Sequence, residues 1–254
     1  MNPTNKIALI TGASRGLGRN TAFNLARGGT DVILTYHSNQ KEADSAVAEI
    51  VALGRKAIAF KLDTGNVNAF GDFAKHLRQS LSEIWGRDRF DFLVNNAGTS
   101  HHAAFDKTTE EELDSLYHVH FKGVFFLTQK LLPLINDGGR IVMISSGLTR
   151  IVIPESAPYA SMKGAIEVLT RYLAKELGPR RIAVNVVAPG AIATDFSGGA
   201  VRDNPKLNKR VADMTALGRV GQPDDIGHMI ASLLSEDNRW VNAQRIEVSG
   251  GMSI

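Results

Sequence analysis

Cysteine is absent from this chain of 254 residues. Its absence excludes disulfide bonds, thiolate metal sites and thiol nucleophiles. The first residues, Met1–Lys6, are short and polar and lack the apolar centre of a signal peptide. No apolar stretch approaches the roughly 20 residues that span a bilayer. We therefore expect a cytoplasmic protein that has no membrane partner.

Charge of one sign is also scarce, because 29 Lys and Arg residues against 26 Asp and Glu residues leave a net charge of only +3. The basic residues are scattered along the chain, so we expect no nucleic-acid partner. Hydrophobic residues make up 43% of the chain and charged residues 22%, which is typical of a globular protein. The length suits one large α/β domain.

Short apolar runs alternate with amphipathic stretches along the whole chain. We expect strands at 6–11, 31–36, 56–62, 90–95, 139–145, 182–188 and 245–248. We expect helices at 16–28, 39–53, 66–85, from about 109 to Pro133, 155–177 and 224–234. This order predicts a single α/β domain of the Rossmann type, with a doubly wound, mostly parallel sheet.

The least regular stretch, 191–216, is rich in Gly, Asp and Asn and follows the sixth strand. A long excursion of this kind is usually either a lid or a surface loop. Its place after the predicted nucleotide contacts favours a substrate lid. Its basic residues Lys206, Lys209 and Arg210 could meet an acidic carrier protein, or they could form a solvated helix face.

A glycine-rich turn, Thr11–Gly18 (TGASRGLG), joins the first strand to the first helix. Glycines allow a tight turn and a close approach of the cofactor, and the helix N-terminus attracts a pyrophosphate. The alternative is a glycine-rich turn without a ligand. No carboxylate follows the second strand at Thr35–Ser38, and Arg15 can supply positive charge, so NADP is favoured over NAD. His37 could add a contact there, or it could be an exposed loop histidine.

Tyr159 and Lys163 are four residues apart near the start of a predicted helix, so they share one face. A nearby cation lowers the pKa of a phenol from its ordinary value near 10, which suits Tyr159 to acid/base chemistry. Ser146 lies 13 residues before Tyr159 at the end of the fifth strand. Its neighbour Ser145 competes for the same role, but adjacent strand residues point to opposite faces. The alternative for Tyr159 and Lys163 is a surface pair.

Together these residues resemble the short-chain dehydrogenase/reductase family, in its compact, non-extended branch, and the likeness extends over almost the whole chain. The closest similarity is to β-ketoacyl-carrier-protein reductases. The resemblance implies that Ser146, Tyr159 and Lys163 are catalytic and that Lys163 also holds the nicotinamide ribose. The cofactor contacts that we expect, partly from the turn and partly from the resemblance, are Gly12, Ser14, Arg15, Gly16, Leu17, Gly18, Tyr36, His37, Ser38, Asp63, Asn95, Ala97, Gly98, Tyr159, Lys163, Pro189, Gly190, Ile192 and Thr194.

One position departs from the family pattern. Where the family usually has an asparagine that supports a proton relay to the lysine, this chain has His120. His120 could replace the asparagine in the relay, since imidazole passes protons, or it could only fill space. A loss of activity is a third reading. We include His120 among the candidate catalytic residues, and we expect no metal site among the nearby histidines His101, His102 and His118.

The sequence therefore predicts an NADP(H)-dependent oxidoreductase that transfers hydride between nicotinamide and a small-molecule carbonyl or alcohol substrate, with Tyr159 as general acid/base. The alternative is a weakly catalytic NADP-binding sensor or scaffold. An extended family member would need more chain after the sixth strand, and an enoyl reductase of this fold separates its tyrosine and lysine more widely. Phe125, Phe126 and Leu169 fit the interface of a homotetramer or homodimer, although core burial explains them equally well.

Overall fold

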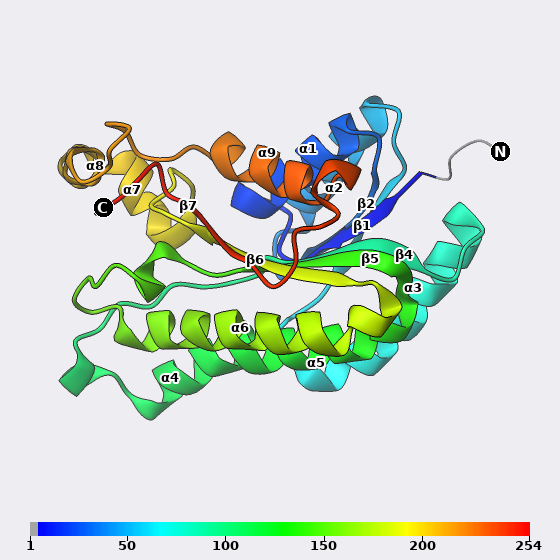
Figure 1. Cartoon of the computed structure of the whole chain (residues 1–254), viewed down its shortest axis with the longest axis horizontal. Helices are drawn as coiled ribbons and strands as arrows, with labels where there is room; N and C mark the ends of the chain where they lie inside the picture. Colours follow the sequence, from blue (N-terminus) through cyan, green and yellow to red (C-terminus); the bar gives the residue numbers. More distant parts are fainter. Residues whose placement is uncertain (1–4) are drawn as a thin grey trace.

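The computed structural model describes residues 5–254, so the prediction about Met1–Lys6 lies mostly outside the described residues. Seven strands form one sheet in the order β3-β2-β1-β4-β5-β6-β7, and every pair is parallel (Figure 1). The strands are β1 Ile7–Ile10, β2 Asp31–Tyr36, β3 Ala57–Lys61, β4 Phe90–Asn95, β5 Ile135–Ile144, β6 Ala183–Pro189 and β7 Arg245–Val248. The predicted doubly wound, Rossmann-type fold is confirmed.

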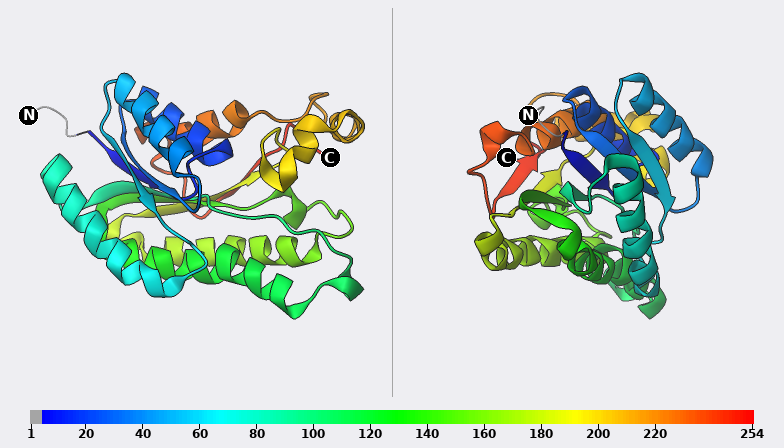
Figure 2. Two further views of the ribbon diagram at one scale, coloured as in Figure 1. Left: turned by 180° about the vertical axis from the view of Figure 1, so that it is seen from behind. Right: turned by 90° about the vertical axis from the view of Figure 1, so that its right-hand side faces the viewer.

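Helices cover both faces of the sheet, as the two views of Figure 2 make plain. On one face lie α1 (Gly16–Arg27), α2 (Gln40–Ala52) and α9 (Pro223–Leu233). On the other lie α3 (Phe70–Trp85), α5 (Gly123–Leu131) and α6 (Ala157–Glu176), with α4 (Glu110–Tyr117) preceding α5. Because all strands are parallel, their carboxyl ends share one edge, and the loops after β4, β5 and β6 meet there.

Alternate strand residues feed two cores. Ile7 and Leu9 of β1 pack with α3, α5 and α6, while Ala8 and Ile10 pack with α1, α2 and α9. Strands buried on both faces read as continuous apolar runs, which is why the sequence revealed them.

The structure corrects the reading of 191–216 as irregular. This stretch contains a 3-10 turn at Phe196–Gly199 and two short helices, α7 (Ala200–Asp203) and α8 (Pro205–Asp213). Asn204 caps α8 by accepting hydrogen bonds from the backbone N–H groups of Lys206 and Leu207. The apolar side of α8 is narrow, so the periodicity of so short a helix was easily missed.

The long helix predicted from about residue 109 is likewise interrupted, because a π-helical turn, His118–Lys122, separates α4 from α5. Over residues 5–254, none of the helices has both the length and the apolar character needed to cross a membrane.

Candidate active site

The glycine turn lies between β1 and α1 and has the shape that a phosphate group requires. Gly12 and Gly16 have φ angles of +64° and +58°, which favour glycine. A Cβ on Gly12 would lie 2.8 Å from Cα of Ala97. Arg15 is the N-cap of α1 but its side chain makes no capping hydrogen bond, and the first turn of α1 has no acidic residue. The turn therefore offers backbone N–H donors and positive dipole to an anion.

Two residues outside the predicted set of cofactor contacts, Thr11 and Asn96, hold this turn in place. The hydroxyl of Thr11 accepts hydrogen bonds from the backbone N–H groups of Asn96 and Ala97, both at 3.0 Å. The side-chain amide of Asn96 donates to the carbonyls of Thr11 and Gly12. A Cβ on Gly18 would lie 2.5 Å from Nδ2 of Asn96. The sequence signal that could have identified them is the presence of polar residues directly after two neighbouring strands, β1 and β4.

The residues predicted to contact the adenosine half of the cofactor lie at or just after the ends of β2 and β3. Tyr36 is buried at the end of β2, while His37 and Ser38 are exposed. One oxygen of Asp63 accepts a hydrogen bond from the N–H of Gly65, and the other lies 3.9 Å from Nε2 of His37. No carboxylate ends β2 itself, so an anionic 2′-phosphate meets no direct repulsion from that strand.

Tyr159 and Lys163 converge on the same face of α6, as the spacing predicts. Both are buried, with exposed fractions of 9% and 5%. Nζ of Lys163 lies 5.5 Å from the centroid of the Tyr159 ring and donates a 2.8 Å hydrogen bond to the carbonyl of Ile144 at the end of β5. The strand end therefore fixes the ammonium beside the phenol.

The geometry separates the two serines. The hydroxyl of Ser145 is turned away from the site and donates a 2.7 Å hydrogen bond to Glu167. The hydroxyl of Ser146 accepts from the N–H of Leu148, and it is near enough to the Tyr159 phenol to lower the pKa of that group. Ser146, the serine predicted from the spacing, is thus the one that faces Tyr159.

Burial sets the protonation of this pair. It raises the pKa of Tyr159 above its ordinary value, although the hydrogen bond from Ser146 acts in the other direction. The sequence analysis expected a lowered pKa. The difference arises because burial of the phenol disfavours its charged form. Burial also lowers the pKa of Lys163, to about 7, so the ammonium is itself destabilised.

His120 lies directly beneath this pair and is 1% exposed. Its ring meets that of Tyr159 edge-on, with centroids 5.2 Å apart. Nε2 lies 2.8 Å from the carbonyl of Thr99, whereas Nδ1 is buried without a hydrogen-bond partner. Burial, followed by the charge of Lys163, lowers the pKa of His120 to about 3. The imidazole is therefore neutral at pH 7. The backbone N–H of Thr99 also donates to Nε2, at 3.2 Å, so the backbone of Thr99 engages this nitrogen with both its donor and its acceptor group.

Comparison with known proteins agrees with this geometry. A family model described as enoyl-(acyl carrier protein) reductase matches residues 12–253. An uncharacterized oxidoreductase of Methylorubrum extorquens is 39% identical over 247 residues, which cover 97% of each chain. The chain belongs to the short-chain dehydrogenase/reductase family.

Two solved members of this family are similar over nearly their whole length. LugOII, a promiscuous reductase that catalyses keto-reduction at C1 during lugdunomycin biosynthesis, is 39% identical, with a TM-score of 0.93 and full coverage of both chains. The angucycline C-6 ketoreductase LanV, solved with bound NADP, is 36% identical, with a TM-score of 0.92 over 98% of this chain and 95% of that one.

The remaining predicted contacts of this short-chain dehydrogenase/reductase lie around the carboxyl ends of β4 and β6. Pro189 ends β6, Gly190 packs against Ser249, and Ile192 bridges to Gly221. Thr194 is buried, and its hydroxyl accepts from the N–H of Phe196.

Of the residues after β4, Gly98 packs on the His120 ring, and a Cβ there would lie 2.7 Å from Cε1 of the imidazole. Asn95 differs from the others because its amide points into the core, where it donates to Thr128. The side chain of Asn95 is therefore part of the core at the end of β4.

One apolar ring from the 191–216 stretch lies beside Tyr159, and further apolar side chains are exposed on the loops at the carboxyl edge of the sheet. The ring of Phe196 lies 6.1 Å from that of Tyr159, centroid to centroid. Phe105, Val152 and Ile153 on the loops after β4 and β5 are exposed. His102 lies 3.4 Å from the hydroxyl of Ser197, so the β4 loop touches the 191–216 stretch.

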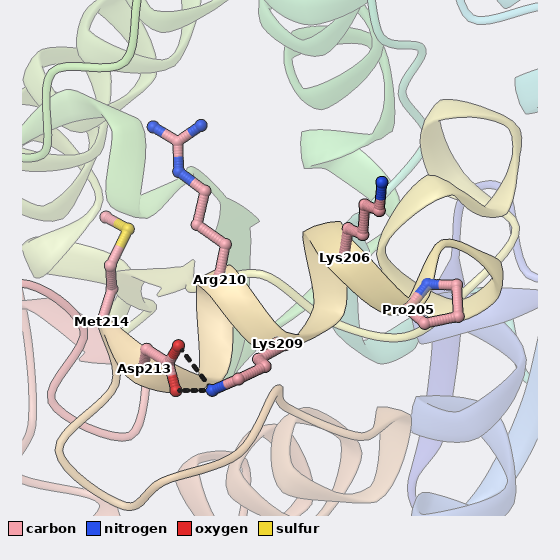
Figure 3. A pocket seen from close by; sticks show the side chains of 6 residues that line it. All are labelled: Pro205, Lys206, Lys209, Arg210, Asp213 and Met214. Atoms are coloured by element: carbon pink, nitrogen blue, oxygen red, sulfur yellow. Dashed lines mark hydrogen bonds and ion pairs between the residues drawn. The ribbon is translucent and has the colours of Figure 1, made fainter.

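Beyond Phe196, α8 carries the basic residues singled out in the sequence. Lys209 pairs with Asp213 at 2.9 Å on one side of the helix, while Lys206 and Arg210 extend together on the other (Figure 3). All three are exposed.

Proposed function

We propose that this protein is an NADP(H)-dependent carbonyl reductase in which Tyr159 is the general acid/base. The observation that carries the proposal is the convergence of Ser146, Tyr159 and Lys163 at the carboxyl edge of the sheet, beside the glycine turn. Support for NADP comes from the absence of a carboxylate at the end of β2, the exposed cation of Arg15 and the NADP bound to LanV.

When bound, the cofactor supplies the hydride. The Ser146 and Tyr159 hydroxyls would hold the carbonyl oxygen of the substrate and polarise it. Because the raised pKa keeps the phenol protonated at neutral pH, Tyr159 is ready to donate its proton to the oxygen as negative charge develops there. With NADP as the proposed cofactor, we expect reduction to be the cellular direction. Lys163, held by the Ile144 carbonyl, would steady Tyr159 and hold the ribose.

His120 supports this chemistry by holding a water in our proposal. Its Nε2 is engaged by the backbone of Thr99, and backbone groups cannot pass a proton on. Its Nδ1 is a buried polar atom that requires a partner, such as a water on the Lys163 side. Of the two readings open from the sequence, the water-holding one therefore suits the contacts better than a relay through the ring.

The substrate that fits this site is a bulky, largely apolar ketone. Support comes from Phe196, whose ring lies beside Tyr159, and from Phe105, Val152 and Ile153, which are exposed on the loops after β4 and β5. LugOII and LanV are both described as reducing ketones. We propose that 191–216 is a lid over such a substrate. The description of the matched family model names an enoyl reductase, but the four-residue spacing of Tyr159 and Lys163 favours a ketone.

The test is a screen of NADPH oxidation, monitored at neutral pH, over ketoacyl thioesters, diketones, cyclic ketones and quinones, repeated with NADH. We expect turnover with NADPH and a bulky cyclic ketone, and a loss of at least about a hundredfold in Tyr159→Phe. Tight NADPH binding without turnover of any carbonyl would instead support the sensor or scaffold. Undiminished turnover in Tyr159→Phe would contradict the role of Tyr159.

We also propose that the protein is a cytoplasmic homotetramer or homodimer. Phe125 and Phe126 on α5, with Val168 and Tyr172 on α6, are 38–65% exposed although they are large and apolar. Exposed apolar faces of this kind usually mark an interface. Leu169, which the sequence placed on the same surface, is buried in the core.

A further inference from the structure

The loop that carries Ser146 and the base of the 191–216 stretch meet at the C-terminal tail. Ser146 is the N-cap of a 3-10 turn, Gly147–Thr149, and Arg150 follows that turn. The Arg150 guanidinium donates to both carboxylate oxygens of Glu247 on β7, at 2.8 and 2.5 Å. It also donates to the backbone carbonyls of Met252 and Ser253. One side chain thus joins the serine loop, the edge strand and the tail.

A second arginine extends this arrangement to the helix that holds Tyr159. Arg245 pairs with Glu247 at 3.0 Å and with Glu167 of α6 at 2.8 Å. Glu167 also accepts the hydroxyls of Ser145 and Thr149. The two carboxylates are only 14% and 18% exposed. Linked, partly buried pairs of this kind hold geometry better than isolated surface pairs.

The tail in turn supports the base of the proposed lid. Met252 bridges to Thr215, and the N–H groups of Ala216 and Leu217 donate to the carbonyls of Gly251 and Gly250. The N–H of Ser253 donates to the carbonyl of Met214 at the end of α8. Met252 also packs in a small core with Ile151, Val211 and Val220. That core contains the residue after Arg150 and the buried side of α8.

From these contacts we infer that Arg150, through its ion pair with Glu247, is a positioning residue that fixes the lid helices α7 and α8 over the Ser146–Tyr159 pair. Arg150 acts through the tail and does not reach the reacting atoms itself. Without the Arg150 side chain the tail is free and the lid opens more often. The glycine turn, which follows β1, keeps its shape. The inference deepens the proposed function and rests on it only for its kinetic readout.

The experiment uses the full chain and the variant Arg150→Met, with limited trypsin digestion as the first readout. The lid offers cleavage sites after Arg202, Lys206, Lys209 and Arg210, all exposed. Cleavage there reports how often the segment opens. We expect lid cleavage, identified by mass spectrometry, to be roughly tenfold faster in Arg150→Met than in the wild type. Glu247→Gln, a milder change that keeps the shape of the side chain, should act in the same direction.

Arg180→Met is the matched control. Arg180 also pairs with a carboxylate, Asp137, and donates to two backbone carbonyls, those of Leu132 and Ile135. It lies between α6 and β6, however, at the amino ends of the strands and away from the lid. This variant should leave lid cleavage unchanged. Equal acceleration in Arg150→Met and Arg180→Met would mean general destabilisation and would overturn the inference, as would no acceleration in either Arg150→Met or Glu247→Gln.

Kinetics with the best ketone from the screen give the second readout. In Arg150→Met we expect KM for the ketone to rise about tenfold, kcat to change less than about threefold, and the Kd of NADPH to stay within about twofold. A Kd for NADPH that rises as much as the ketone KM would contradict a role confined to the lid. If no carbonyl is reduced by the wild type, the proposed function fails, but the trypsin comparison still decides the inference.

Discussion

At the scale of single residues, His120 is the most informative side chain. The ring is buried, neutral and tied to Thr99 on one nitrogen, while the other nitrogen has no partner. A buried polar atom without a partner costs free energy and usually serves a bound water or ligand. An asparagine at the same position is shorter, but its amide also offers a donor and an acceptor. We therefore expect the essential property here to be a buried polar group that binds a water rather than an imidazole.

His120→Asn tests this view by activity and by pH. Turnover should be kept or raised. Because the pKa of His120 is about 3 in the folded protein and near 6.5 in the unfolded chain, the unfolded chain binds more protons between those values. The stability that comes from keeping His120 neutral in the folded protein is complete above pH 6.5 and is lost as the pH falls. Wild type should therefore lose roughly 2 kcal/mol more unfolding free energy than His120→Asn between pH 7.5 and 4.5.

Urea denaturation of both proteins across this pH range gives the measurement. Parallel pH profiles would show that the burial of His120 does not affect acid stability. A collapse of turnover in folded His120→Asn would mark the imidazole as specialised for the reaction.

At the scale of elements, the π-helical turn between α4 and α5 places His120 in the site. The helix approaches the backbone of Thr64 so closely at Gly123 that a Cβ there would lie 1.9 Å from the Thr64 carbonyl oxygen and 2.7 Å from that of His118. Only glycine fits at this point. The widened turn carries His120, and π-helical turns often occur at functional sites.

Gly123→Ala should therefore destabilise the protein by more than about 2 kcal/mol, since either the helix or the Thr64 loop must move. Gly164 of α6 is the control, because it is also helical but has open space around its Cα. Gly164→Ala should stabilise by roughly 0.5–1 kcal/mol through the loss of glycine's backbone freedom. Chemical denaturation of the two variants checks the contrast, and equal effects would rule out close packing at Gly123 as the cause.

At the scale of the whole molecule, the apolar face of α5 and α6 suggests self-association. A hollow of about 500 Å³ in this face is lined by Phe125, Val168, Leu169 and Tyr172, among others. Two parallel helices with such a face can pair with the same face of a second copy across a two-fold axis. Tyr172 lies near the end of α6, whereas Tyr159 lies near its start at the carboxyl edge of the sheet. Association centred on Tyr172 would therefore leave the site open.

Tyr172→Glu should shift the protein to a smaller assembly, because a charge placed at the centre of an apolar interface loses its hydration there. Trp240→Glu serves as the control, since Trp240 is 96% exposed on the segment before β7. Sedimentation velocity measures the outcome. A wild-type protein that is monomeric at micromolar concentration would refute the proposed interface.

The sequence by itself determined the parallel sheet and most of its elements. The strands 31–36, 90–95 and 245–248 agree with β2, β4 and β7 residue for residue. Of these, β2 and β4 are fully buried, and fully buried parallel strands are continuous apolar runs. The spacing of Tyr159 and Lys163 likewise predicted their common face, because helix geometry is local. Ser146 and the glycine turn were predicted for the same reason: their signals lie in short, contiguous segments.

Tertiary structure decided what depends on contacts between distant segments. Packing turned Ser145 toward Glu167 and Ser146 toward Tyr159, drove the Asn95 amide into the core, and widened one helical turn beneath the site. Burial, which no local pattern reveals, raised the pKa of Tyr159 and lowered those of Lys163 and His120. The union of Arg150, Glu247 and the tail joins residues about 100 positions apart, and only the folded chain brings them together.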